Sequence, residues 1–170
     1  YLAGQSSPSI SFIKKKETIR SNYIGCKNTL ESIYQIDKKI KFFYPASSEM
    51  YGKIKGKISL KTKKSPINPY GMSKLMVENI LSDYDEAYDL KFTSLRYFNV
   101  MGSDSSLEIG DMDENNTNLL NSIFRAIGNK QEFKIYGENY ETKDGSCIRD
   151  YIHVCDLAEA HILALEKQLQ

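Results

Sequence analysis

Apolar side chains recur along the chain with two different periods. Between residues 17 and 36 they return every three or four residues, which is the spacing of one helix face. The short apolar run "IKFFYPA", Ile40 to Ala46, suits a buried strand. The pair Asn68-Pro69 is typical of an N-cap followed by Pro at the first helical position, which predicts a helix to about Tyr88. The stretch "KFTSLRYF" then predicts a further strand.

The first hundred residues therefore alternate between strands and helices. We interpret "YLAG" at residues 1–4 as the end of a buried strand, and because it lacks a Met we expect the chain to be a fragment. The order strand, helix, strand, helix, strand predicts an α/β fold with a doubly wound, Rossmann-like parallel sheet, of which the chain holds the C-terminal part. Ligands bind such sheets beyond the carboxyl ends of the strands, here near residues 2–6, 46–49 and 98–102.

The pattern changes after Gly102, where a polar stretch suggests a loop. An amphipathic helix is predicted at 118–127, and "EFKIYG" and "DYIHV" suit short strands. Asp156 and Glu159 have the spacing of a capping box for a final helix. We expect three segments: a sheet domain at 1–101, a smaller α/β subdomain at 102–149, and a strand and helix at 150–170 that return toward the sheet domain.

Composition excludes several classes of partner. The net charge is +1 and only four of the 23 basic residues are Arg, which argues against a nucleic-acid or anionic membrane partner. The three Cys form no Cys-x-x-Cys and the two His lie in no metal-ligand spacing, so no metal site is predicted. Reduced, structural thiols fit a cytoplasmic protein. The chain contains no apolar run long enough to cross a bilayer.

Tyr and Lys stand four residues apart at four places, where chance alone gives roughly one. A tyrosine acts as a base only if its pKa falls from about 10 toward neutrality, which requires roughly 4 kcal/mol. One ammonium at about 4 Å supplies that much at an effective dielectric near 20. Helical spacing puts such a pair on one face. The four pairs are Tyr23/Lys27, Tyr34/Lys38, Tyr51/Lys55 and Tyr70/Lys74.

Only the last pair has the setting of an acid–base site. Tyr51/Lys55 leads into a loop, and the other two tyrosines lie on the apolar face of the first predicted helix. Tyr70 and Lys74 lie in the first turns of a helix with a marked start, after the hydroxyl-rich turn "ASSEMYG" at the end of a strand. A Ser of that turn could share a substrate oxygen with Tyr70.

The segments "ASSEMYG" and "NPYGMSKLMVE" resemble the active-site region of extended short-chain dehydrogenases/reductases, the nucleotide-sugar epimerase/dehydratase group. "LRYFNVMG" resembles the next strand of that group, and "IYGENYETKDGSCIRDYIHVCDLAEAH" is similar to UDP-glucose 4-epimerases. The resemblance implies that 1–101 is the second half of an NAD-binding domain. It implies an isomerase of galactose metabolism that inverts C4 of a UDP-hexose through a 4-keto intermediate.

The resemblance also implies residue roles. Tyr70 would take the proton of the sugar 4-hydroxyl, Ser47 would hydrogen-bond the same oxygen, and Lys74 would bind the nicotinamide ribose. NAD contacts are implied for Leu2, Ala3, Gly4, Asn22, Tyr70, Lys74 and Phe98. Contacts with the nucleotide-sugar substrate are implied for Ser47, Tyr70, Asn99, Thr117 or Asn118, Tyr136 and Arg149. A homodimer packed through the helices at 17–36 and 69–88 is a further implication.

Glu49 departs from the epimerase pattern, which has a small or hydroxyl residue at that position. A Glu there is typical of nucleotide-sugar 4,6-dehydratases and UDP-glucuronate decarboxylases; in the dehydratases it removes the C5 proton. "AGQSSPSISF" also resembles GDP-mannose dehydratases. The longer match near the C-terminus favours the epimerase, and the dehydratase or decarboxylase is the alternative. A second alternative is a nucleotide-binding regulatory protein without turnover, against which the complete set of Ser47, Tyr70 and Lys74 argues.

Overall fold

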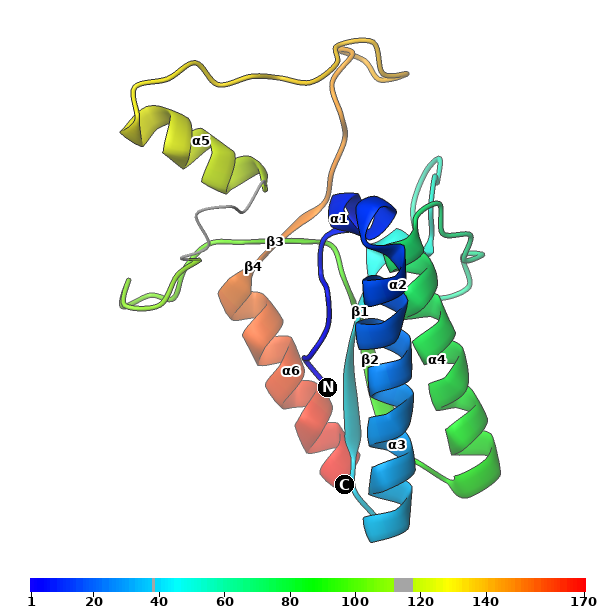
Figure 1. Cartoon of the computed structure of the whole chain (residues 1–170). Helices are drawn as coiled ribbons and strands as arrows, with labels where there is room; N and C mark the ends of the chain where they lie inside the picture. The colour runs from blue at the N-terminus through cyan, green and yellow to red at the C-terminus, as the bar shows by residue number, and fades with distance from the viewer. Residues whose placement is uncertain (38, 112–117) are drawn as a thin grey trace. The chain divides into compact units, whose positions relative to one another are not determined.

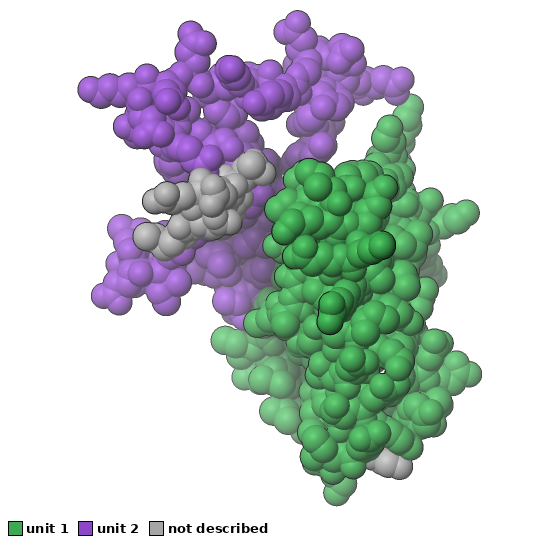
Figure 2. All heavy atoms as spheres, viewed as in Figure 1, with its two compact units in different colours: residues 1–98, 161–170 green, residues 99–160 purple. Residues whose placement is uncertain are grey.

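The computed structural model describes residues 1–37, 39–111 and 118–170. The chain folds into two compact units, which Figure 2 shows in different colours. Unit 1 holds residues 1–98 and 161–170, and unit 2 holds residues 99–160. The division into three segments that the sequence suggested stays a prediction.

A nearly continuous helical stretch begins unit 1 (Figure 1). It consists of α1 (Pro8–Ile13), α2 (Lys15–Ile19), a π-helical turn (Arg20–Ile24) and α3 (Gly25–Ile36). This confirms the helix predicted at 17–36, although α1 was not predicted. Ser7 begins α1 as its N-cap, accepting a hydrogen bond from the backbone N–H of Ile10 at 3.3 Å.

A parallel pair of strands and its crossover helix form the rest of the core. Strands β1 (Phe42–Ser47) and β2 (Phe92–Tyr97) pair in parallel, with Ser47 opposite Tyr97. Helix α4 (Pro69–Tyr88) connects them, and Asn68 is its N-cap, as predicted. The buried core is apolar and comes from α3, β1, α4 and the adjoining turns: Cys26, Leu30, Phe42, Tyr44, Ala46, Met50, Val77, Leu81 and Leu90.

The expected strand end at residues 1–4 is wrong. This segment forms no strand, and its link to β1 is one hydrogen bond from the Tyr1 amino group to the Phe43 carbonyl oxygen at 2.8 Å. One bond does not make a ladder. The parallel α/β arrangement is confirmed, whereas the doubly wound sheet stays a prediction because β1 and β2 form a two-stranded sheet within the described residues.

Unit 2 contains a second parallel pair, β3 (Asn99–Met101) with β4 (Tyr151–His153), and helix α5 (Leu119–Gly128). The predicted helix at 118–127 and the strand in "DYIHV" are confirmed. The strand expected in "EFKIYG" is wrong, because those residues are exposed and pair with no strand in the described part of the chain.

The last helix, α6 (Val154–Leu169), begins two residues before the expected capping box. Asp156 therefore lies in the first turn of α6 rather than at its N-cap position. The ring of His153 accepts a hydrogen bond from the backbone N–H of Cys155 at 3.2 Å instead. A histidine side chain thus satisfies one of the unpaired N–H groups at the start of α6.

Candidate active site

A pocket of about 190 Å³ lies where the N-terminal segment, the π-helical turn, β1 and α4 meet. It lies in unit 1, and residues far apart in the sequence line it: Tyr1, Leu2, Ala3, Gly4, Gln5, Ser6, Asn22, Tyr44, Pro45, Ala46, Tyr70, Lys74 and Tyr97. Six of the seven residues for which the resemblance implied a cofactor contact are therefore brought together. Phe98, the seventh, lines another cavity, so its cofactor contact stays a prediction.

Tyr70 is placed by the start of α4. Asn68 caps the helix and Pro69 occupies its first position, so Tyr70 lies in the first turn, where its side chain is 8% exposed. Burial raises the pKa of Tyr70, the Ser47 hydrogen bond lowers it, and the charge of Glu49 raises it further. The net direction is upward, so the protein alone favours the neutral phenol over the phenolate.

Ser47 ends β1 and begins the next turn, a 3₁₀ helix at Ser48–Met50. Its hydroxyl oxygen accepts a hydrogen bond from the Glu49 backbone N–H at 3.2 Å, and the side chain is buried. Because a hydroxyl can accept and donate at once, Ser47 can also donate its proton to the Tyr70 oxygen, which is the hydrogen bond that lowers the Tyr70 pKa. This arrangement suits a group that shares a substrate oxygen with the phenol.

Lys74 lies one helical turn after Tyr70. Its ammonium donates to the Pro45 carbonyl oxygen at 2.7 Å and lies 5.6 Å from the centre of the Tyr70 ring and 4.9 Å from that of Tyr44. Burial lowers the pKa of Lys74 to about 8, against a smaller opposing effect of Cys26. The predicted placement of Lys74 beside Tyr70 is confirmed. The expected lowering of the Tyr70 pKa is wrong for the protein alone, because the net shift is upward with burial as its largest cause.

Asn22 and Gly4 also line the pocket. The Asn22 carboxamide donates to the Gln5 carbonyl oxygen at 2.9 Å and to the Ser73 hydroxyl at 3.0 Å, and accepts from the Gln5 N–H at 2.8 Å and the Ser21 hydroxyl at 3.0 Å. These four bonds use the full capacity of the side chain. A Cβ on Gly4 would lie 2.7 Å from the Asn22 Oδ1 atom, so Asn22 also holds the glycine backbone at close range. Its direct contact with a cofactor stays a prediction.

In the other three Tyr–Lys pairs, the described side chains contact other residues of the protein. Tyr51 is 3% exposed and accepts a hydrogen bond from the Arg96 guanidinium at 2.7 Å. Lys27 forms an ion pair with Glu31, and the ring of Tyr34 lies 4.4 Å from that of Tyr88. Lys38 falls outside the described residues. Of the four pairs, Tyr70/Lys74 is the one that lines the pocket.

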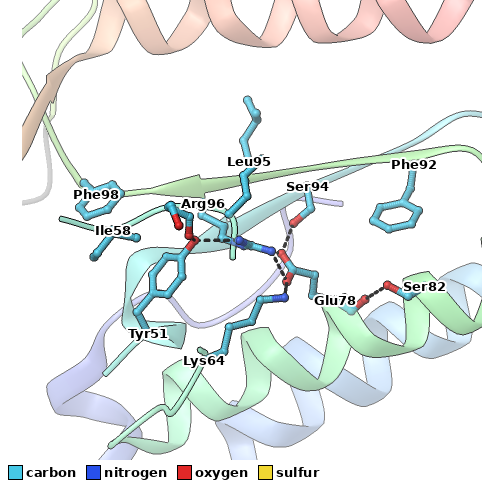
Figure 3. Close-up of a pocket in the computed structure, with 12 residues that line it drawn as sticks. Tyr51, Ile58, Lys64, Glu78, Ser82, Phe92, Ser94, Leu95, Arg96 and Phe98 are labelled. Carbon is cyan, nitrogen blue, oxygen red and sulfur yellow. Dashed lines mark hydrogen bonds and ion pairs between the residues drawn. The ribbon is translucent and has the colours of Figure 1, made fainter. Parts of the chain in front are cut away.

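A larger cavity of about 610 Å³ lies beside β2 and α4, where it contains a buried charge cluster (Figure 3). The Glu78 carboxylate, on α4, accepts from Arg96 at 2.8 and 2.9 Å, from the Ser94 hydroxyl at 2.9 Å, and from the Lys64 ammonium. Burial alone would raise the pKa of Glu78, but these hydrogen bonds outweigh it and lower the pKa. The ion pair between Lys64 and Glu78 connects the lysine-rich loop at 53–64 to α4.

The residues implied in substrate binding belong to unit 2, apart from Ser47 and Tyr70. Asn99 is exposed and donates to the Asp150 carbonyl oxygen at 2.9 Å, and Tyr136 is 82% exposed. Arg149 is exposed and donates to the neighbouring Ile148 carbonyl oxygen at 2.8 Å. Asn118 is the N-cap residue of α5, and Thr117 lies outside the described residues. Their substrate contacts stay predictions.

Known proteins similar to this chain identify its family. A model of the NAD dependent epimerase/dehydratase family matches residues 1–170. The chain belongs to this family. Among curated family members, the UDP-glucose 4-epimerase of Streptococcus mutans serotype c is 39% identical over 168 residues, which are 97% of this chain and 50% of that protein. The UDP-glucose 4-epimerase of Halalkalibacterium halodurans is 38% identical over 152 residues, 88% of this chain and 45% of that protein.

Solved structures of family members match a similarly large share of this chain. The UDP-glucose 4-epimerase from Brucella ovis in complex with NAD matches with a TM-score of 0.90 and 36% identity, over 98% of this chain and 51% of that chain. The Bifidobacterium longum enzyme in complex with NAD⁺ and UDP matches with a TM-score of 0.88 and 32% identity, over 97% of this chain and 50% of that chain. The chain thus spans about half the length of these family members.

The pocket has room for only part of a ligand as large as a dinucleotide. At about 190 Å³ it is smaller than the roughly 300–1,000 Å³ of pockets that enclose drug-sized ligands. The buried hydroxyl of Tyr44 and the Gln5 Oε1 atom belong to residues that line the pocket, and they have no hydrogen-bond partner among the described residues. Polar groups of a nicotinamide riboside are of the right kind to supply these bonds. Sequence reasoning missed Tyr44 and Tyr97, although Tyr97 lies at the carboxyl end of a parallel strand, and it included Gln5 only within the expected ligand-binding range 2–6.

Within residues 1–37, 39–111 and 118–170, no group of three or more His, Cys, Asp and Glu side chains could hold a metal ion. In the same ranges, no helix is long and apolar enough to cross a membrane.

Proposed function

We propose that this protein is an NAD-dependent epimerase that inverts C4 of a UDP-hexose, such as UDP-glucose or UDP-galactose, through a 4-keto intermediate. The observation that carries the proposal is the pocket that Tyr70 and Lys74 line together with Gly4, with the Ser47 hydroxyl hydrogen-bonded to Tyr70. The similarity to UDP-glucose 4-epimerases over almost the whole chain supports the choice of reaction.

Each side chain has a distinct part. Tyr70 exchanges a proton with the sugar 4-hydroxyl oxygen, as base when the alcohol is oxidised and as acid when the ketone is reduced. Ser47 donates its hydroxyl proton to the same oxygen and so fixes the oxygen's position. Lys74 binds the nicotinamide ribose, and its positive charge favours the phenolate of Tyr70 in the base form. Bound NAD would supply the hydride acceptor and, in its oxidised form, a second positive charge.

The raised pKa of Tyr70 has a functional consequence. Burial makes the phenol a poor base in the protein alone, and it makes the Lys74 ammonium easier to deprotonate. The same burial excludes water, so any positive charge that enters the pocket acts on Tyr70 with little screening. The site therefore becomes basic mainly when a cationic group binds.

The direct test supplies UDP-galactose to the protein, expressed with any sequence that its gene encodes on either side of residues 1–170. Formation of UDP-glucose, followed by proton NMR, is the expected result. A preparation that binds NAD but interconverts no UDP-hexose would contradict the proposal. The Tyr70→Phe variant is the control, because it keeps the ring but loses the exchangeable proton.

The alternative reaction is that of a nucleotide-sugar 4,6-dehydratase or a UDP-glucuronate decarboxylase, and Glu49 is the observation that favours it. It predicts a 4-keto-6-deoxy sugar or a pentose as product, and a Glu49→Gln variant of a dehydratase would stop after oxidation. The same NMR experiment detects either product.

A nucleotide-binding regulatory protein without turnover would bind NAD and nucleotide sugars and form none of these products. Its binding of NAD and nucleotide sugars would also be unchanged by Tyr70→Phe, and neither the wild type nor the variant would form a product.

The proposed assembly is a homodimer in the cytoplasm, packed through the helical stretch at 17–36 and through α4. Exposed apolar side chains on or beside these helices support it: Ile24, Ile36, Met72 and Tyr88. Sedimentation at micromolar concentration measures the assembly, and a monomeric wild type would contradict it.

A further inference from the structure

Glu49 and Asn68 form a hydrogen-bonded pair at the start of α4. The Asn68 amide nitrogen donates to the Glu49 carboxylate at 2.6 Å, and the Asn68 amide oxygen accepts from the Gly71 backbone N–H at 2.7 Å. Asn68 is 8% exposed and Glu49 is half-buried, so water has limited access to the pair. Tyr70 lies between Asn68 and Gly71, inside the turn that this cap closes.

The chemistry of the pair fixes which way the Asn68 carboxamide faces. An ionised carboxylate only accepts hydrogen bonds, whereas a carboxamide has one donor end and one acceptor end. Glu49 therefore binds the donor end of Asn68, and this leaves the acceptor end for the N–H of Gly71. A neutral Gln at position 49 could face either end and would enforce no orientation.

The same short turn also holds Ser47 and packs on the helix. The backbone N–H of Glu49 donates to the Ser47 hydroxyl at 3.2 Å. A Cβ on Gly71 would lie 2.5 Å from the Glu49 carbonyl oxygen, so the turn and the first turn of α4 are in direct backbone contact. Residue 49 is thus the point at which the turn that carries Ser47 is joined to the turn that carries Tyr70.

We propose that Glu49 is a positioning residue, whose carboxylate holds Asn68 in the orientation that caps α4 and thereby sets Tyr70 opposite Ser47. This inference rests on the proposed epimerase function, since it assigns Glu49 to the placement of the acid–base group. It gives Glu49 a role that needs no proton abstraction at C5. It also explains how an epimerase tolerates a glutamate where a small residue is the rule.

The sharpest test exchanges the donor and the acceptor of the pair. Asn68→Asp places two carboxylates against each other, so the contact with Glu49 becomes repulsive. Adding Glu49→Gln restores both bonds with the roles reversed. The new amide at position 49 donates to one carboxylate oxygen at position 68, and the other oxygen still accepts from the Gly71 N–H. Glu86→Gln, which changes an exposed carboxylate on the same helix, is the matched control.

The expected result is a fall in kcat of about tenfold to a hundredfold for Asn68→Asp, the size that a misplaced reacting group produces, with KM nearly unchanged. The double variant Glu49→Gln/Asn68→Asp should recover most of that loss. Glu86→Gln should match the wild type. A double variant as slow as Asn68→Asp, although it unfolds at the wild-type temperature, would overturn the positioning role.

Failure of the proposed function gives a different result. Suppose that the wild type dehydrates the nucleotide sugar and does not epimerise it, and that every variant without a carboxylate at position 49 stops after oxidation. Glu49 is then the base, and the positioning inference fails together with the epimerase proposal. If the wild type catalyses neither reaction, the epimerase proposal fails alone. In that case the unfolding temperatures still test the pair: Asn68→Asp should be destabilised and the double variant restored.

Discussion

Replacing Glu78 by Leu should remove one of the strongest links between α4 and the sheet. Glu78 is 5% exposed and binds Arg96, Ser94 and Lys64, which belong to β2 and to the lysine-rich loop (Figure 3). The substitution leaves the Arg96 guanidinium in place without its carboxylate. An unpaired charge at a site this buried costs far more than the loss of a surface ion pair.

The magnitude follows from the burial of the partners. Breaking a buried pair by removing one partner typically costs about 3–5 kcal/mol. The side chains of Arg96 and Lys64 are 18% and 26% exposed, so water can solvate part of each freed charge. We therefore expect a loss of about 2–4 kcal/mol in the free energy of unfolding. The double variant Glu78→Leu/Arg96→Met removes both charges and should lose less than Glu78→Leu.

Urea unfolding followed by circular dichroism measures these differences. Glu86→Leu, on the exposed side of α4, serves as control and should change the unfolding free energy by less than about 0.5 kcal/mol. The lowered pKa of Glu78 adds a pH signature. Its contribution is present above the pKa of an unfolded Glu, about 4.3, and is lost as the pH falls through the lower folded value. A loss below about 1 kcal/mol for Glu78→Leu, or a pH profile identical to that of the wild type, would refute this reasoning.

Three further outcomes are expected. Tyr70→Phe should lower kcat by about a hundredfold or more while the dissociation constant for NAD, measured by calorimetry, stays close to wild type. Because burial lowers the pKa of Lys74 to about 8, the unfolding free energy of the wild type relative to that of Lys74→Met, measured without ligand, should rise between pH 8 and 10.5, where the unfolded lysine still holds the proton that the folded one has lost; a pH-independent difference would contradict this. Gly4→Ala should weaken NAD binding more than Ala3→Gly does, since its Cβ would lie 2.7 Å from Asn22 Oδ1; equal affinities would contradict the tight fit.

The sequence predicted best where the local signals were strong. Asn68-Pro69 located the start of α4 to the residue, because an N-cap side chain and a Pro at the first position are local chemistry. The parallel relation of β1 and β2 followed from the helix between them. Tyr70 and Lys74 were predicted to lie together because residues four apart in a helix lie on the same face.

Contacts between residues far apart in the chain could not be predicted from the sequence. The strand expected at residues 1–4 failed because a strand exists only through its partner, and here one bond links it to β1. The sign of the Tyr70 pKa shift also depended on burial, which spacing does not encode. Nothing local indicated that the Asn22 side chain would be fully occupied by Gln5, Ser21 and Ser73.

Helix α4 connects these observations. Asn68 and Glu78 are ten residues apart, about 15 Å along a helix, and each is held by a buried polar contact, to Glu49 and to Arg96. Tyr70 and Lys74 lie between these two points, and Tyr70, Lys74 and Glu78 share one face because they are four residues apart. A helix fixed at two points can neither rotate nor slide without breaking a buried contact at one of them. The acid–base pair is therefore held in position by residues outside it, and changes at Glu49 or Glu78 should affect the geometry of the pocket without touching a residue that lines it.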